Sequence, residues 1–163
     1  MKTLALTSID IADPSLTHHD TDSPTLLLVY TGTDNAVLDP GLIESAVLDP
    51  LSTAFAAVQR HWRALTAAAE NGRLVIAAPA HAALGDPDRP LDSAVVGALI
   101  SFVRSVAIEL RKSNGSANTV LFEQNVSESG CAEVIRTLIT STRTATGQEI
   151  FVTDGLDLGR LHP

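Results

Sequence analysis

The sequence predicts an α/β domain of three layers, in which a sheet of about five mostly parallel strands carries helices on both faces. Short, continuously apolar runs alternate along the chain with longer segments of helical periodicity, which is the order of an α/β fold. The apolar runs show no polar alternation, as expected of strands that are buried on both faces. The chain has 163 residues, of which 45% are hydrophobic, so residues 1–163 suffice for a single compact domain with its own core.

Three strands and one helix are predicted in the first half of the chain. The strands are expected at residues 3–11, 25–30 and 73–79. Between the last two, a helix is predicted at residues 50–70, with Asp49 as its N-cap and Pro50 in its first turn. Asn71 and Gly72 should end this helix, with Gly72 in the left-handed conformation.

The stretch between the first two strands, residues 11–24, is predicted to be a loop because it lacks an apolar period. It contains His18 and His19 with Asp20 and Asp22, a set that could bind a metal. No second cluster with ligand spacing accompanies this set, and histidines beside acids are common on solvated loops. We therefore predict no metal site.

The longest predicted helix spans residues 92–110 and is apolar on almost every side. Its core face consists of six residues at helical spacing: Val95, Leu99, Phe102, Val103, Val106 and Leu110. Gly97, Ser101 and Ser105 form a stripe of small residues that lets another helix approach closely. One side of the helix should cover the sheet, and the other should contact a second helix, from this chain or from another copy. An irregular loop is expected before it, at residues 81–91.

The C-terminal part adds two strands and a helix. The strands are predicted at residues 117–122 and 149–153. The helix is predicted at residues 130–142, with Ser129 as its cap and four apolar residues facing inward: Val134, Ile135, Leu138 and Ile139. Cys131 lies in phase with these residues, which favours a buried, inert thiol over a reactive one at a helix N-terminus.

Composition excludes several classes of partner. The formal net charge of −8 argues against binding to nucleic-acid phosphates, which requires Lys and Arg. The single cysteine forbids an intrachain disulfide and fits a reducing compartment. The N-terminus lacks an apolar signal region, and no stretch is expected to reach the length that spans a membrane. We therefore expect a cytoplasmic protein that binds neither nucleic acid nor membrane.

Several segments together resemble the short-chain dehydrogenase/reductase family. RSVAIEL, at residues 104–110, resembles the end of the helix that carries the family's active site. LLLVYTGT and GRLVIAAP resemble two of its central strands, LDPLSTAF the start of another helix, and TGQEIFVTDG its closing strand. The order and spacing of these matches imply a reduced Rossmann-like fold. In this fold the loop at residues 11–24 would replace the nucleotide-binding half.

The same resemblance identifies what this chain lacks. The family's catalytic tyrosine and lysine correspond to Asp92 and Val96 in this sequence, and its catalytic serine corresponds to Pro79 or Ala78. The family's active-site asparagine corresponds to Pro50. The glycine-rich turn that binds the nucleotide is also missing from the N-terminal segment. We therefore expect no catalytic residue, no cofactor and no hydride transfer by this chain.

The resemblance allows the N-terminal strand to correspond to either of two strands in the family's sheet. MKTLALTS resembles the family's first strand, whereas the segment at residues 10–13 resembles its third strand. The first strand of the family lies beside the strand that residues 25–30 resemble. The third lies at the far edge of the sheet, where it would have no neighbour in this shortened chain. The first placement is therefore favoured.

An assembly role follows from the resemblance. In the family, the helices that residues 50–70 and 92–110 resemble pack against the same pair from a second subunit. We expect a non-catalytic partner or scaffold, either a homo-oligomer or a heteromer with a full-length short-chain dehydrogenase/reductase. The competing interpretation, that these helices only cover the sheet, is disfavoured because it requires polar outward positions. Val95, Val96, Gly97 and Ile100 do not supply them. The candidate interface residues are Phe55, Trp62, Gly97, Ile100, Ser101, Arg104 and Ser105.

The alternative is a small-ligand binder or a non-redox enzyme in a residual cleft at the strand ends. His81, Asp92 and Asp34 should lie at this cleft, near Asp86 and Asp88. A His–Asp pair there could perform general acid–base catalysis. The competing interpretation of the same residues is a solvated acidic loop.

Overall fold

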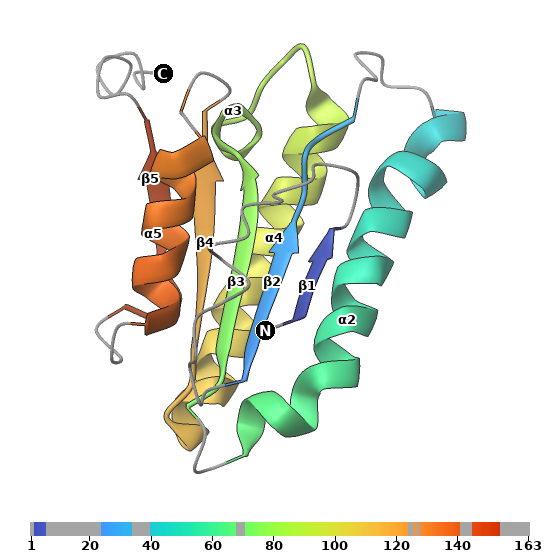
Figure 1. Cartoon of the computed structure of the whole chain (residues 1–163). Coiled ribbons are helices and arrows are strands. Elements are labelled where there is room, and N and C mark those ends of the chain that lie inside the picture. Colours follow the sequence, from blue (N-terminus) through green and yellow to red (C-terminus); the bar gives the residue numbers. More distant parts are fainter. Residues whose placement is uncertain are drawn as a thin grey trace.

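A computed structural model of the chain describes residues 2–5, 24–33, 40–67, 71–123, 126, 128–140 and 145–153. Within these ranges the chain forms one five-stranded parallel sheet, with the strands in sequence order (Figure 1). The strands are β1 (Lys2–Ala5), β2 (Thr25–Val29), β3 (Arg73–Pro79), β4 (Ser116–Phe122) and β5 (Glu149–Val152). The predicted sheet of about five parallel strands is therefore confirmed. The predicted loop at residues 11–24 lies outside the described residues, except for Pro24.

The N-terminal strand lies next to β2. The two strands run parallel, with Lys2 opposite Leu26 and Ala5 opposite Val29. This is the place expected if the strand corresponds to the first strand of the resembled family. Residues 10–13, which suggested the alternative placement at the far edge, lie outside the described residues.

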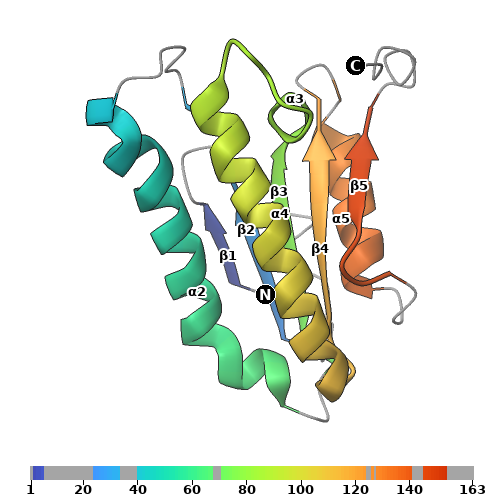
Figure 2. The same cartoon turned by 180° about the vertical axis from the view of Figure 1, so that it is seen from behind.

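Helices cover both faces of the sheet, as predicted. Helices α2 (Asp49–Thr66) and α4 (Pro90–Leu110) lie on one face, and α5 (Glu128–Thr140) lies on the other (Figures 1 and 2). Alternate side chains of β2 contribute to the two cores: Leu26 and Leu28 pack toward α2 and α4, whereas Leu27 packs toward α5. Burial on both faces explains why the strands are apolar throughout.

Helix α2 begins differently from the prediction. A 3-10 turn at Pro40–Leu42 and a π-helical turn at Glu44–Leu48 precede it. Asp49 therefore has helical backbone angles, and its N–H donates a hydrogen bond to the Glu44 carbonyl. The prediction of Asp49 as an N-cap is wrong, because an N-cap residue has non-helical angles and begins the helix rather than continuing it.

The end of α2 also differs from the prediction. Asn71, with a φ of 46°, adopts the left-handed conformation expected for Gly72. Asparagine tolerates this region better than most residues with a side chain. Gly72 is needed for a different reason, since a Cβ added there would lie 2.2 Å from the Leu65 carbonyl oxygen. The glycine thus allows the chain to pass close to the last turns of α2.

Helix α4 is the central packing element of its face. It contacts β3, β4 and α2, and also a short helix, α3 (Ala80–Ala83), that lies in the stretch expected to be irregular. With neighbours on several sides, Val95, Val96 and Ile100 are buried within the chain. Val95 thus lies in the core, as its place on the predicted core face requires. The argument that the apolar character of these residues indicates an outward contact is wrong, because the core alone explains it.

Two further corrections concern helix boundaries and length. Helix α5 begins at Glu128, so the backbone of Ser129 is inside the helix rather than at its cap.

The segment Pro90–Ser113 is long and apolar enough, by length and composition only, to cross a membrane. The expectation that no stretch reaches such a length is therefore wrong. Half of its most hydrophobic window is buried inside the structure, and core helices commonly meet the same criterion.

Candidate functional site

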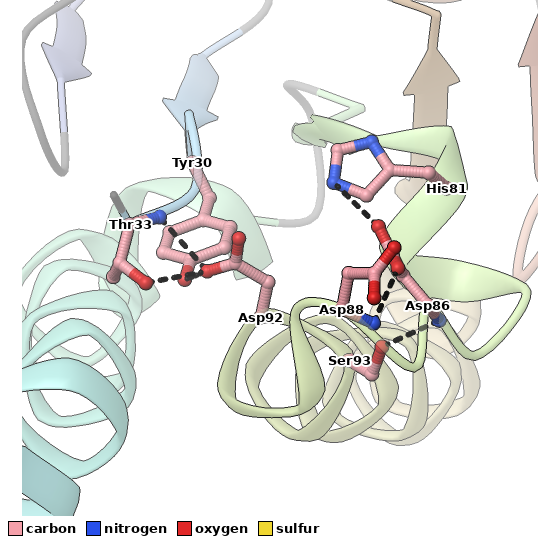
Figure 3. Close-up of polar contacts among 7 residues, drawn as sticks. All are labelled: Tyr30, Thr33, His81, Asp86, Asp88, Asp92 and Ser93. Atoms are coloured by element: carbon pink, nitrogen blue, oxygen red, sulfur yellow. Dashed lines mark hydrogen bonds and ion pairs between the residues drawn. The ribbon is translucent and has the colours of Figure 1, made fainter. Parts of the chain in front are cut away.

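The carboxyl ends of β2 and β3 meet the first turn of α4 at one edge of the sheet. Tyr30 and Thr33 follow β2, His81 follows β3, and Asp92 lies in the first turn of α4 (Figure 3). In open parallel sheets this edge is where ligands bind. It is therefore the first place to look for a functional site.

Asp92 is the centre of a buried hydrogen-bond network. Its side chain is fully buried, and its Oδ1 accepts hydrogen bonds from the Tyr30 hydroxyl at 2.7 Å, the Thr33 N–H at 2.8 Å and the Thr33 hydroxyl at 3.0 Å. A buried carboxylate is costly without such donors. The position in the first turn of α4 is also favourable, because the helix dipole stabilises negative charge there. The network joins the turn after β2 to the start of α4.

Tyr30 acts in this network as a permanent donor. It is fully buried, and this burial raises the pKa of its phenol well above the usual range. The hydrogen bond to Asp92 and the negative charge of that carboxylate raise the pKa further. The phenol thus stays protonated at neutral pH, and it is not suited to exchange protons with a substrate.

The second oxygen of Asp92 lies against a glycine. Asp92 Oδ2 has no hydrogen-bond partner within the described part of the chain. Gly32, with a φ of 89°, packs over it, and a Cβ added to Gly32 would lie 3.0 Å from Oδ2. Glycine suits this position for two reasons: it adopts the left-handed backbone conformation without strain, and it has no side chain to press against the carboxylate.

His81 belongs to a separate polar group. Its Nε2 lies 3.9 Å from Asp86 Oδ2, while Asp86 Oδ1 accepts a hydrogen bond from the Asp88 N–H at 2.9 Å. The Asp86 N–H donates to the Ser93 hydroxyl oxygen at 3.0 Å. These bonds fasten the loop before α4 to its first turn. Figure 3 shows this group on the opposite side of Asp92 from Tyr30 and Thr33.

The structure thus places His81 and Asp92, two of the three predicted cleft residues, in separate polar groups. His81 pairs with Asp86, whereas Asp92 binds Tyr30 and Thr33. Asp34, the third predicted residue of the cleft, lies outside the described residues. Sequence reasoning missed Tyr30 and Thr33 as the partners of Asp92. The available signal was the single acid in the first turns of a helix that is otherwise apolar.

The positions that correspond to the family's other catalytic groups are packing positions. Val96 is buried one turn after Asp92. Ala78 and Pro79 are the last two residues of β3, and Pro50 is buried in the first turn of α2. None of these four side chains has a group that could transfer a proton.

Cys131 lies half-buried on α5. Burial raises the pKa of the Cys131 thiol, which agrees with the inert thiol favoured by the sequence and opposes a reactive one. Among the described residues, no group of three His, Cys, Asp or Glu side chains could hold a metal ion. His18 and His19 lie outside these residues.

The candidate interface residues differ in exposure. Five are exposed on the outer side of α2 or α4: Phe55, Gly97, Ser101, Arg104 and Ser105. Trp62 is half-buried, and Ile100 is only 9% exposed. Arg104 forms an ion pair with Glu149 at the start of β5, so part of its charge is already neutralised.

Comparisons with known proteins identify the fold. No protein-family model and no curated protein sequence matches the chain. Its structure is similar to that of a putative oxidoreductase from Escherichia coli K-12, with a TM-score of 0.69 and 19% sequence identity. That match covers 79% of this chain and 62% of the oxidoreductase.

Two dehydrogenases of known structure are also similar to this chain. Acetoin dehydrogenase from Enterobacter cloacae matches with a TM-score of 0.71 and 18% identity. That match covers 86% of this chain and 66% of the acetoin dehydrogenase. Sorbitol-6-phosphate 2-dehydrogenase from Erwinia amylovora matches with a TM-score of 0.71 and 12% identity. That match covers 81% of this chain and 68% of the dehydrogenase. The chain thus spans about two thirds of the length of these proteins. It has a shortened form of the Rossmann-like fold found in short-chain dehydrogenases.

Proposed function

We propose that this chain is a non-catalytic, dehydrogenase-like subunit that assembles through the outer sides of α2 and α4. The partner is a second copy or a full-length short-chain dehydrogenase/reductase. The observation that supports this proposal is an exposed surface of apolar and small residues, which we call the α2–α4 face: Phe55, Gly97, Ser101, Ser105 and Ile108.

Large apolar side chains lie on this face. Ile108 is 65% exposed and Phe55 is 43% exposed. The Phe55 ring also packs against Phe102 of α4, with ring centroids 4.4 Å apart, so α2 and α4 are in contact at this face. Exposed apolar side chains that adjoin one another are typical of protein–protein contacts.

Small residues on α4 leave room for a neighbouring helix. Gly97 is exposed, and nothing lies within 4 Å of the position that its Cβ would occupy. Ser101 and Ser105 continue this low surface along α4, where the Ser105 hydroxyl bonds back to the Ser101 carbonyl at 3.1 Å. Helices approach each other closely where such small side chains face one another.

The proposal of a non-catalytic role rests on Asp92 and Tyr30. Asp92 stands where the resemblance expects the catalytic tyrosine, and its Oδ1 is bound to three donors of the chain itself. Tyr30, the only tyrosine of the chain, is buried and kept protonated. The alternative, a ligand-binding cleft with His81 and Asp92, has less support because these residues belong to different networks.

The mass of the purified chain in solution, measured by light scattering, tests this proposal. We expect a dimer or a larger oligomer whose mass and melting temperature do not change with NADH or NADPH. Ser101→Arg should convert it to a monomer, since a long cation on the α2–α4 face would block close approach. Thr137→Arg, an equal change on the exposed side of α5, should leave the oligomer intact.

Other results would separate the possible partners. A monomeric wild-type chain would exclude self-assembly. A stable complex with a purified full-length dehydrogenase, lost in Ser101→Arg and retained in Thr137→Arg, would then support the heteromer. A ligand that binds only the folded state raises the melting temperature. A higher melting temperature with NADH or NADPH would therefore show nucleotide binding and contradict the proposal of a non-catalytic subunit without a cofactor.

A further inference from the structure

A second polar site lies at the edge of the sheet opposite to Asp92. Helix α4 ends there and continues as a 3-10 turn at Arg111–Ser113, beside the start of β4 (Figure 2). A helix of 21 residues separates this edge from Asp92 by about 30 Å. A cavity of about 280 Å³ opens at this edge. It is lined by Arg111, Asn114, Gly115, Ser116 and Thr146.

Two backbone acceptors at the end of the helix are already bound. The Leu110 carbonyl accepts hydrogen bonds from the Gly115 N–H at 2.8 Å and the Ser113 hydroxyl at 3.1 Å. The Arg111 carbonyl accepts from the Asn114 N–H at 3.3 Å. These two carbonyls, which would otherwise repel an anion, are therefore engaged by donors of the chain.

The side chains that line the cavity, in contrast, keep free donors. The Arg111 guanidinium, the Asn114 amide and the Ser116 hydroxyl have no hydrogen-bond or ion-pair partner among the described residues, although Ser116 is only 4% exposed. The Thr146 hydroxyl oxygen accepts from the Ala117 N–H at 3.2 Å, which leaves its own hydrogen available. Among the residues that the structure describes, no carboxylate lines the cavity.

Two acids on neighbouring described segments are already paired. Glu109 on α4 binds Lys112 at 2.7 Å, and Glu149 at the start of β5 forms an ion pair with Arg104. Arg111 thus has no anionic partner within the described part of this chain, whose net charge is −8. The other described side chains that line the cavity are neutral.

We propose that this cavity binds a small oxyanion group, a phosphate or a carboxylate, through Arg111, Asn114, Ser116 and Thr146. A guanidinium with nearby hydroxyl and amide donors matches the geometry of such groups. The cavity holds several times the volume of one water, about 30 Å³, and lies just below the usual range of metabolite pockets. This site is independent of the α2–α4 face.

The backbone around the site is preformed. A Cβ added to Gly115 would lie 2.8 Å from the Gly72 carbonyl oxygen and 3.1 Å from the Leu110 Cβ. The Ser116 N–H donates to the same Gly72 carbonyl at 2.9 Å. Little rearrangement is therefore needed on binding, whereas the exposed Arg111 side chain must be ordered, which points to millimolar affinity.

Titration of the ¹⁵N-labelled full chain with inorganic phosphate, and separately with malonate, tests the site. Sodium chloride keeps the ionic strength constant, because surface charges are screened by salt. We expect saturable shifts of the Gly115 amide and the Asn114 side-chain amide. Arg111→Gln should weaken binding about tenfold or more, since it removes the charge-assisted bonds. Arg60→Gln, which removes an exposed charge on α2, should leave the affinity unchanged.

Each outcome decides the proposal. Saturation by phosphate alone identifies a phosphate site, saturation by malonate alone a carboxylate site, and saturation by both a general oxyanion site. Ser116→Ala provides a second variant that keeps the strand and removes one donor, and it should weaken binding several-fold. The proposal is overturned if neither anion saturates, or if Arg111→Gln and Arg60→Gln bind with the same affinity.

Discussion

The Tyr30 hydroxyl donates a hydrogen bond of 2.7 Å to Asp92 Oδ1, across 62 positions of sequence. The two residues lie on different elements, one just after β2 and the other in the first turn of α4. Thr33 adds two further hydrogen bonds to the same oxygen. The contact therefore fastens the sheet edge to the longest helix, at the position that the resemblance assigns to the catalytic tyrosine of short-chain dehydrogenases.

Asp92→Ala should destabilise the protein strongly. It leaves the buried Tyr30 hydroxyl and the Thr33 N–H without an acceptor, and we expect a loss of about 2–4 kcal/mol in the free energy of unfolding. Urea denaturation measures this loss. Asp88→Ala, at an exposed position of the preceding loop, should change stability by less than about 0.5 kcal/mol. Equal effects of the two substitutions would show that the Asp92 network contributes little.

Stability should fall at alkaline pH because of Tyr30. The folded state raises the pKa of this phenol, so the unfolded chain releases the proton first, from about pH 10, the ordinary value. The contribution is fully present below that pH and is lost progressively above it. Denaturation curves of wild type and Tyr30→Phe between about pH 8 and 11 should converge as pH rises. Parallel curves would mean that the phenol ionises equally in both states.

Gly32→Ala should cost more stability than Gly85→Ala. Both glycines have positive φ angles, 89° and 84°, so alanine is strained at either position by about 1 kcal/mol. Only at Gly32 would the new methyl group press against Asp92 Oδ2, because nothing lies within 4 Å at Gly85. The difference between the two losses, from thermal or urea unfolding, isolates this contact. No difference would indicate that the carboxylate moves aside freely.

Gly97→Ala should affect folding and assembly in opposite directions. Alanine in the middle of a helix stabilises the folded chain by about 0.5–1 kcal/mol relative to glycine, and open space surrounds the position. On the α2–α4 face, however, the added methyl group keeps a second helix further away. Unfolding at low concentration should therefore shift to higher urea while the dissociation constant of the oligomer increases. An unchanged dissociation constant would place the interface elsewhere.

Most secondary structure could be predicted because its causes are local. Strands β2, β3 and β4 agree with the predicted ranges within one residue, since apolar runs of this length have few alternatives. The errors occur at helix ends, where contacts with neighbouring segments determine which residue begins or ends the helix. Asp49 continues a helix that starts before it, and Asn71 rather than Gly72 takes the left-handed conformation, because Gly72 is needed where the chain passes Leu65.

The sequence by itself determined the parallel sheet and the helices on its two faces. Periodicity suffices for these conclusions, since it depends on neighbouring positions only. The tertiary structure decided which side of α4 is core and what Asp92 binds. Val95, Val96 and Ile100 are buried because the sheet, α2 and α3 surround α4, and the Tyr30–Asp92 bond exists because two distant segments meet at one sheet edge. Such contacts depend on packing in three dimensions, which no local pattern records.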